Sequence, residues 1–292
     1  MKKWLLSILI LTLAVVLIAC GSENEEDSSG GDDDSSSEAS KWDEIQEEGE
    51  LVVGTSGTLY PASFYPEDSD ELTGYDVEIM KEVADRLELD LSFEEYAVDG
   101  LLSSIESGRV DMVINDMEIT EERQKSFTFS EPYKHSYSTM VVREDDLSGI
   151  DSLEDIEGKV HGGGATTVYA QIAEHFGAEI KSYGNVTNDV YLRDVENGRT
   201  DLIINDYYLQ SLALEALPEL EVTIHPDLQF HPKESGIVMP EGEDELKEKV
   251  DEKLNEMRED GTLTEISEEF YGGQDASEKP DVDAEEIEGL DI

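Results

Sequence analysis

In the first half of the chain, short runs of apolar residues alternate with segments in which apolar residues have helical spacing. The run at 51–55 predicts a β-strand, and apolar positions three and four residues apart over 75–87 predict a helix. A second apolar run at 89–93 predicts another strand. A short helix at 99–108 and a buried strand at 110–114 follow. This order of strands and helices is typical of an α/β layer with a mostly parallel sheet.

The same order restarts after Arg143. A strand leads into the glycine-rich stretch 162–167, and helical spacing follows over 168–176. A further helix at 189–196 precedes a buried strand at 202–204. The second segment therefore predicts a second lobe that resembles the first.

The C-terminal part returns to this pattern. Residues 236–239 predict one more strand, and a long helix follows with apolar residues on one face from Leu246 to Met257. Gly261 separates this helix from a short one at 263–270. Two lobes and a C-terminal return predict an α/β fold with a cleft between the lobes.

Two phrases of the sequence are near copies: SGRVDMVIND at 107–116 and NGRTDLIIND at 197–206. The glycine of each phrase is predicted to end a helix, and the arginine beside it is predicted to be structural. Each Asn-Asp pair follows a buried strand at its carboxyl end, where open α/β sheets place their ligand crevices. A repeated metal site, a duplicated active site and two halves of one cleft are all conceivable. The equivalent positions of the phrases favour two halves of one cleft.

The N-terminus has the form of a secretion signal. Two lysines precede an apolar run from Trp4 to Ala19, which is shorter than the about 20 apolar residues of a membrane span. Cys20 follows directly and is the only cysteine, so no internal disulfide can form. The arrangement resembles the lipobox of bacterial lipoproteins, whose cysteine becomes the acylated, palmitate-bearing N-terminus. The alternative is a spacer cysteine in an ordinary signal or anchor helix.

Acidic polar segments flank the predicted folded part. Residues 1–19 are expected to be the signal peptide, and residues 20–40 a lipidated cysteine with a flexible, self-repelling tether. Residues 273–292 are expected to be an acidic disordered tail. These segments predict a lipid-anchored protein on the extracytoplasmic face of the cell membrane.

The net charge is −53, from 73 acidic and 20 basic residues. This charge argues against a nucleic-acid partner, because phosphate binding needs the opposite sign. A calcium sponge is one interpretation, but the acids are dispersed and no EF-hand spacing occurs. A solvated surface suited to a salty or alkaline exterior is favoured. The histidines are scattered without a metal-binding spacing, so we expect no metal and no cofactor.

Two short stretches carry candidate binding groups. Thr120 is predicted to be an N-cap, which would place Arg123 at the third position of a helix near the crevice. An arginine there can hold a carboxylate through two parallel hydrogen bonds, although a surface ion pair is the alternative. The second stretch is the glycine run before Thr166 and Thr167, where a helix start offers free N–H groups to an anion.

These phrases together resemble the extracellular solute-binding proteins of polar amino acid ABC transporters, which have the type II periplasmic-binding fold. The likeness covers about 45–272. The matching phrases are 51–55, Leu72-Thr73-Gly74-Tyr75-Asp76, both Gly-Arg-x-Asp phrases, Ile119 to Arg123, Phe129 to Tyr133, Thr166-Thr167 and Asp260 to Leu263. The resemblance implies a first lobe of 45–138 plus 233–272, and a second lobe of 139–232.

The resemblance also implies roles for individual residues. Arg123 would grip the α-carboxylate of an amino acid, and Thr166 and Thr167 would donate to the same group. Of the two threonines, Thr167 is the better match to the family. Asp206 would hold the α-ammonium. Met117 and Glu118 fall where the family uses backbone contacts to the ligand. The implied partners are a free amino acid and the permease of an ABC importer, and the protein would be a monomer without catalytic residues.

The expected side-chain pocket departs from the family pattern. Leu59, with Tyr60 beside it, stands where the family usually stacks an aromatic ring, and Val98 stands at a second aromatic position. Asp116 and Glu118 stand where small hydroxyl residues are common. Two pocket acids favour a cationic or extended polar side chain, such as arginine, lysine or cystine.

Two other classes of protein remain as alternatives. The same fold resembles that of some dehydratases of the cyclohexadienyl type, which need a poised acid or base in the cleft, and Glu118 is the only obvious candidate. A ligand sensor that acts through a membrane partner is the third class.

Overall fold

The computed structural model of the protein describes residues 40–183 and 186–290. Residues 38–292 form one compact unit, distinct from residues 1–37, and only this unit is considered below. The predicted signal peptide, Cys20 and almost all of the predicted tether lie outside the described residues. Within the described ranges, no helix has the length and apolar character that a membrane span requires.

The first lobe is built on a mixed sheet of five strands in the order β4-β1-β5-β12-β6. β1 is parallel to both β4 and β5, whereas β12 is antiparallel to β5 and β6. Four of these strands were predicted from apolar runs. The strand bounds are β1 Glu50–Thr55, β4 Asp90–Glu95, β5 Met112–Val113, β6 Phe127–Phe129 and β12 Val238–Pro240.

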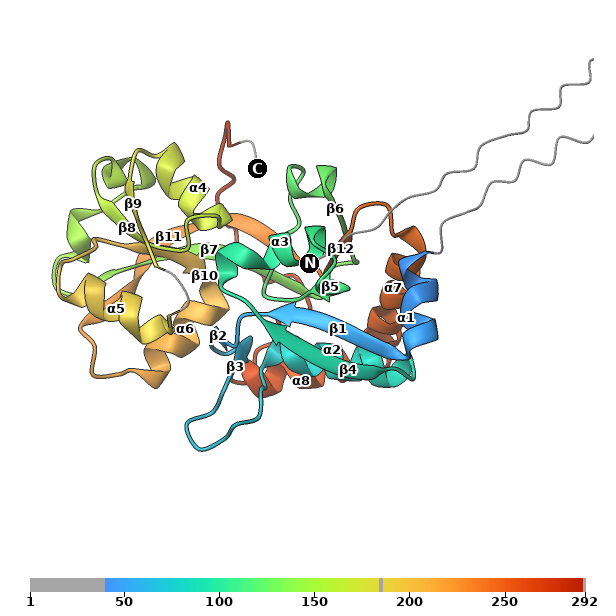
Figure 1. The fold of residues 1–292 in the computed structure, drawn as a ribbon. Helices are drawn as coiled ribbons and strands as arrows, with labels where there is room; N and C mark the ends of the chain where they lie inside the picture. Colours follow the sequence, from blue (N-terminus) through green and yellow to red (C-terminus); the bar gives the residue numbers. More distant parts are fainter. Residues whose placement is uncertain (1–39, 184–185, 291–292) are drawn as a thin grey trace, which may run out of the picture. The chain divides into compact units, whose positions relative to one another are not determined.

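Five helices belong to this lobe, and the predicted apolar stripes explain their packing. Ile79 and Val83 of α2 and Leu246 and Leu254 of α7 are fully buried in one core. α1, which the sequence did not predict, lies beside α7 and begins at a capping box formed by its N-cap serine (Figure 1). The helix bounds are α1 Lys41–Glu48, α2 Tyr75–Arg86, α3 Leu101–Glu106, α7 Asp244–Asp260 and α8 Thr262–Phe270.

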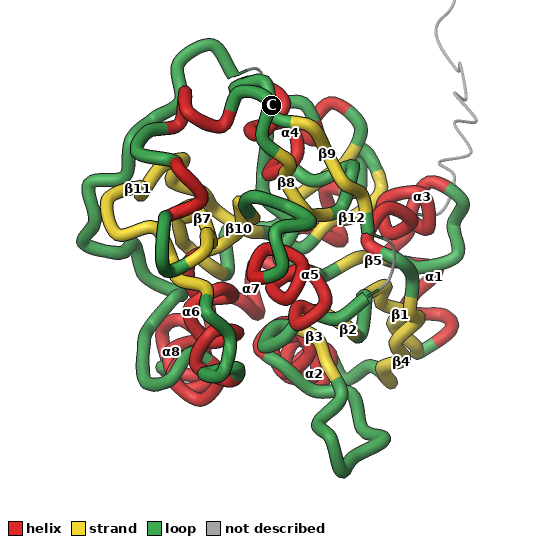
Figure 2. Tube along the Cα trace, turned by 90° about the vertical axis from the view of Figure 1, so that its left-hand side faces the viewer, coloured by secondary structure: helices red, strands yellow, loops and turns green. Residues whose placement is uncertain are grey.

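The second lobe has its own core beneath two short parallel strands. β8 and β9 lie side by side, and a single bridge from His161 to Leu202 joins β8 to the start of the second repeated phrase (Figure 2). Ile172 of α4 and Ile204 of β10 are buried in this core. The element bounds are β8 Val160–Gly163, α4 Val168–His175, β9 Glu179–Ser182, α5 Asn188–Glu196, β10 Ile203–Asp206 and α6 Tyr207–Ala216.

Two long antiparallel strands connect the lobes: β7, Lys134–Arg143, and β11, Val222–Ser235. We call this pair the hinge strands. They pair from Ser235 opposite Lys134 to Val222 opposite Arg143, with two register shifts, and β10 pairs with the other edge of β7 (Figure 1). The expected lobe boundaries at 138/139 and 232/233 fall inside this pair. Short pieces complete the fold: β2 Thr58–Leu59, β3 Ser63–Phe64, η1 Val98–Gly100, η2 Arg123–Lys125, η3 Leu147–Gly149 and η4 Leu153–Ile156.

The C-terminal segment departs from the prediction of a disordered tail at 273–292. Ala276 is fully buried in the first core, and its carbonyl accepts a hydrogen bond from the backbone of His135. Further along, Glu285 exchanges backbone hydrogen bonds with β11, and Ile287 and Leu290 pack against the second core. The acidic composition suggested disorder, but these few apolar contacts and backbone bonds hold the segment against both lobes.

The twin phrases occupy equivalent places in the two lobes. Gly108 and Gly198 have φ of 65° and 66°, the left-handed conformation that ends a helix, as predicted. In the first lobe the backbone N–H of Val52 donates to the side chain of Asp111 at 2.8 Å. In the second, the N–H of Val160 donates to Asp201 at 2.9 Å. The aspartate of each Gly-Arg-x-Asp phrase therefore ties its strand to a neighbouring strand.

Candidate functional site

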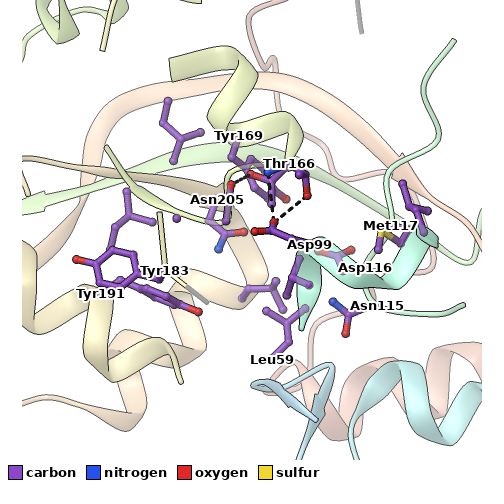
Figure 3. Close-up of a pocket in the computed structure, with 18 of the residues that line it drawn as sticks. Leu59, Asp99, Asn115, Asp116, Met117, Thr166, Tyr169, Tyr183, Tyr191 and Asn205 are labelled. Carbon is purple, nitrogen blue, oxygen red and sulfur yellow. Dashed lines mark hydrogen bonds between the residues drawn. The ribbon is translucent and has the colours of Figure 1, made fainter. Parts of the chain in front are cut away.

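A cavity of about 330 Å³ lies between residues of the two lobes. Its volume falls at the lower end of the range for small-molecule sites. It is lined from the first lobe by Leu59, Val98, Asp116, Met117 and Arg123, which the sequence named as candidate binding residues. The other lining residues considered below are Asp99, Asn115, His161, Thr166, Thr167, Tyr169, Tyr183, Tyr191 and Asn205 (Figure 3).

Arg123 reaches the cavity from a shorter element than expected. Residues 123–125 form a single 3-10 turn and not an α-helix, so the prediction of a third helical position is wrong. Thr120 still acts as predicted, because its hydroxyl accepts the N–H of Arg123 at 3.2 Å. The guanidinium donates to the carbonyl of Glu118 at 2.9 Å. Burial lowers the pKa of Arg123, whereas the charge of the Glu118 carboxylate acts to raise it.

Thr166 and Thr167 both line the cavity but use their hydroxyls differently. Thr167 is the N-cap of α4, because its hydroxyl accepts the N–H of Ala170 at 3.2 Å and donates to the carbonyl of Gly164 at 2.9 Å. The hydroxyl of Thr166 donates to Asp99 of the first lobe at 2.8 Å. Thr167 therefore shapes the start of the helix, while Thr166 presents a donor toward the opposite lobe.

Behind the cavity, two acids and two lysines form a buried ion cluster. The Lys134 ammonium lies 3.1 Å from Asp116 and 3.0 Å from Asp206, so it joins an acid of each lobe. Lys233 lies 3.0 Å from Asp116 and 3.5 Å from Asp206. The hydroxyl of Ser235 donates to Asp116 at 2.7 Å. Both lysines belong to the hinge strands, so this cluster connects the two lobes at the strands about which they would move.

The charges of the cluster balance one another. Burial opposes the charge of Asp116, but Lys134 and Lys233 outweigh it and lower the pKa of this carboxyl to about 2. Burial likewise opposes the charge of Lys233, but Asp116, Tyr169 and Asp206 hold its pKa well above the usual value. Asp116 and Lys233 are therefore both charged at neutral pH.

Asp206 is fully buried and is not among the residues that line the cavity, although its neighbour Asn205 is. One carboxylate oxygen accepts the N–H of Leu209 at 3.0 Å and caps α6. The other oxygen, Oδ2, has no hydrogen-bond partner among the described residues, and the Lys233 ammonium lies 3.5 Å from it. A buried acceptor without a donor is costly, so Asp206 retains the capacity to bind one.

Glu118 and Tyr60 lie away from this cavity, contrary to prediction. The Glu118 carboxylate lies 2.6 Å from Nε2 of His231 and lines a second cavity of about 580 Å³ beneath the C-terminal segment. The ring of Tyr60 packs edge-on against Phe64. Since Asp116 is neutralised by lysines and Glu118 faces His231, neither of the two predicted pocket acids offers a free negative charge to a ligand side chain.

The Met117 and Glu118 carbonyls, expected to contact the ligand, already accept hydrogen bonds. The N–H of Gly236 donates to Met117 at 3.0 Å, and Arg123 donates to Glu118. A carbonyl can accept a second donor, so these contacts do not remove either group from a binding role.

Sequence reasoning missed the aromatic wall of the cavity and the cluster lysines. Tyr169, Tyr183 and Tyr191 come from the second lobe, and Tyr183 and Tyr191 contact edge to face with ring centroids 5.2 Å apart (Figure 3). A usable signal existed for the lysines, because bases are rare in this chain and Lys134 and Lys233 each lie in a β-type segment. No local pattern marked the tyrosines.

His161 was also missed. It is fully buried on β8, lines the cavity, and its Nδ1 accepts the N–H of Ile204 at 3.2 Å. Burial lowers its pKa to about 4, so the ring is neutral at physiological pH. Asn115 and Asn205, which belong to the twin phrases, face the cavity from the two lobes.

The arrangement is suited to binding and orienting a small charged molecule. Arg123 supplies a half-buried cation, the Asp206 region supplies an acceptor, and aromatic and aliphatic walls lie between the lobes. Throughout the part of the chain that the structure describes, no group of three or more His, Cys, Asp or Glu side chains is placed to hold a metal ion.

Comparison with known proteins supports the same class. Residues 51–273 match the family described as bacterial extracellular solute-binding proteins, family 3. The chain is 47% identical over 249 residues to the probable ABC transporter extracellular-binding protein YckB of Bacillus subtilis, covering 85% of this chain and 87% of that protein. The crystal structure of YckB aligns with a TM-score of 0.69 at 48% identity, covering 85% of this chain and 99% of that one.

Two further relatives carry ligand names. The L-cystine-binding protein TcyA of Bacillus subtilis is 32% identical over 277 residues, covering 93% of this chain and 98% of that protein. An ancestral arginine-binding protein bound to arginine aligns with a TM-score of 0.70 at 32% identity, covering 77% of this chain and 99% of that one. With most of its length matched and a two-lobed α/β fold around a cavity, the chain belongs to family 3 of the bacterial extracellular solute-binding proteins.

Proposed function

We propose that the protein binds a free amino acid between its two lobes and delivers it to an ABC importer. The observation that carries this proposal is the cation of Arg123. It lines the cavity, and no carboxylate lies within ion-pair distance of it among the described residues. A half-buried guanidinium without an acidic partner is well matched to the carboxylate of a ligand.

The acceptor of Asp206 supports the other end of the same head group. Its free Oδ2 could accept a hydrogen bond from an α-ammonium. This ammonium would also compete with Lys233 for the same oxygen. Asp206 does not line the observed cavity, so the ligand would reach it past Asn205. A zwitterion held from both lobes would stabilise their association.

For the side chain of the ligand, we favour an extended polar amino acid such as arginine or cystine. The support is twofold. Relatives that share about a third of the sequence are named for L-cystine or were solved with arginine. The cavity is lined by three tyrosines, Tyr169, Tyr183 and Tyr191. Aromatic faces can stack on a guanidinium or pack against a disulfide.

The location and partners follow from the family and the N-terminus. Members are extracellular, and we propose that an acylated Cys20 anchors this chain to the outer face of the cell membrane as a monomer. The permease of an ABC importer would then receive the ligand. Catalysis is not proposed, because Glu118, the only candidate acid, lies against His231 in the other cavity.

A thermal-shift screen of the amino acids and cystine on residues 38–292 tests this function, because a ligand that binds only the folded state raises its apparent stability. Arg123→Ala should weaken binding at least about tenfold, since a charge-assisted hydrogen bond to a buried group is lost. Arg109→Ala is the matched control, because this arginine is exposed and lies outside the cavity.

Asp206→Asn keeps an oxygen that can cap α6 but removes the charge that would hold the ammonium. We expect a loss of affinity and also a loss of stability, because Lys134 and Lys233 then share a single acid. Binding is therefore compared as the ligand-induced shift from the variant's own melting temperature. The proposal fails if no amino acid shifts the melting temperature, or if Arg123→Ala binds as tightly as Arg109→Ala.

A further inference from the structure

One hydrogen-bonded contact crosses the mouth of the cavity from lobe to lobe. Oδ1 of Asp99, in the turn before α3, accepts the Thr166 hydroxyl at 2.8 Å and the Thr166 N–H at 3.4 Å (Figure 3). The same turn packs on the second lobe at Gly164, where a Cβ would lie 3.5 Å from Oδ1 of Asp99 and 3.9 Å from Val98. Two independent features therefore place the Asp99 carboxylate against the second lobe.

In this contact the Thr166 hydroxyl, which is expected to donate to the ligand carboxylate, donates to the carboxylate of Asp99. The Thr166 hydroxyl can donate only one hydrogen bond, and in the structure it donates that bond to Asp99. Thr167 offers no replacement, since its hydroxyl proton goes to the carbonyl of Gly164. A ligand carboxylate that is to be held by both Arg123 and Thr166 must therefore displace Asp99.

The charge of Asp99 adds to this competition. It has no lysine, arginine or histidine within ion-pair distance in the ranges 40–183 and 186–290, unlike Asp116 and Asp206. An approaching carboxylate would meet an uncompensated negative charge at the same donor, and like charges side by side disfavour binding.

We propose that Asp99 is an internal carboxylate that occupies the Thr166 donor in the absence of ligand and competes with the ligand for it. Asp99 thereby acts as a specificity-determining residue. Only a ligand whose carboxylate is also held by Arg123 gains enough to displace it. This inference rests on the proposed function and assigns a role to a residue on which that function does not depend.

The test measures the binding of L-arginine and L-cystine to residues 38–292 by titration calorimetry. Asp99→Ala should lower the Kd by about two- to fivefold, which is the factor expected when an exposed hydrogen-bonded contact of modest strength no longer competes. Asp85→Ala is the matched control, because Asp85 is exposed on α2 and makes no side-chain hydrogen bond or ion pair with any residue that the structure describes. It should leave the Kd unchanged, which separates local competition from the removal of one charge.

Thr166→Val completes a double-mutant cycle. It removes the contested hydroxyl, so the wild-type background should lose affinity. Asp99→Ala should give a smaller gain in the Thr166→Val background, where only the charge of Asp99 and its bond to the Thr166 N–H still oppose the ligand. The inference is overturned if Asp99→Ala binds more weakly than the wild type, or if its gain is equally large in the Thr166→Val background. An equal Kd for Asp99→Ala and Asp85→Ala overturns it as well.

The two proposals fail in different ways. If the wild type and Asp99→Ala both bind no amino acid, the proposed function fails and this inference fails with it. If the wild type binds and Arg123→Ala does not, but Asp99→Ala gives no gain, only the inference about Asp99 fails. Binding that appears only in Asp99→Ala supports both.

Discussion

The two repeated phrases begin alike in structure and end differently. In both, a left-handed glycine ends a helix and an aspartate side chain accepts the N–H of a neighbouring strand. At the far end the phrases diverge. Asp116 has φ of 50° and accepts from two lysines and a serine, whereas Asp206 caps α6 and keeps one oxygen without a hydrogen bond.

This difference separates the first aspartate of each phrase, which has a structural role, from the last aspartate, whose role differs between the lobes. The first aspartate of each phrase holds two strands together, so any lobe of this design needs it. The last aspartate lies where the lobes meet, so its partners depend on the other lobe. Asp116 is fully satisfied and holds the hinge lysines in place, while Asp206 is the one with an acceptor left for a ligand.

The largest expected effect comes from removing these last aspartates. Asp116→Ala and Asp206→Ala each leave a buried lysine short of a partner, which should cost about 3–5 kcal/mol of unfolding free energy. Asp116→Ala should cost more, because this carboxylate accepts from both lysines and from Ser235. Urea denaturation of both variants measures the difference. Equal losses, or a larger loss for Asp206→Ala, would contradict the contrast drawn between the two acids.

A second expected effect is confined to the first lobe. Burial, followed by the Asp116 charge, raises the pKa of Asp76 to about 7, and the N–H of Asp116 donates to Asp76 at 2.6 Å. Since the unfolded chain releases this proton near 3.8, the native state binds more protons between these two values. The contribution of Asp76 to stability therefore falls as the pH rises from about 4 to about 7.

Asp76→Asn removes this dependence. The free energy of unfolding of the variant relative to wild type should rise between pH 5 and pH 8, by at most about 4 kcal/mol over the whole titration. Asp85→Asn, on the exposed side of the same helix, is the control and should show no such change. A relative stability that does not change with pH would show that Asp76 is ionised normally.

The smallest expected effect tests the likeness of the phrases. Asp111→Ala and Asp201→Ala should each cost about 1–3 kcal/mol, because each leaves a backbone N–H without its acceptor. The loss for Asp111→Ala should be the larger, since its side chain is 8% exposed and lies 2.8 Å from Lys41. The side chain of Asp201 is 29% exposed and lies 3.7 Å from Arg143. Denaturation of both variants measures this. If only one variant is destabilised, the two aspartates do not have the same structural role.

Periodicity was enough to predict most helices and the central strands, because those elements carry their apolar residues at regular spacing. It did not predict the hinge strands. β11 contains Pro226 and Pro232 and changes register twice, so no simple alternation marks it. The C-terminal segment was missed for a related reason. Its acidic composition is an average over the whole segment, so it does not reveal the few positions, such as Ala276 and Leu290, that pack against the cores.

The sequence by itself determined the two α/β halves, the glycines that end the twin helices, and, through resemblance, the arginine at the cavity. Only the tertiary structure decided what each charged side chain faces. Lys134 and Lys233 meet acids that are far away along the chain, and Asp99 meets Thr166 across the cleft. The physical reason is that helices and strands follow from local spacing, whereas the fate of a buried charge depends on which distant group supplies its partner.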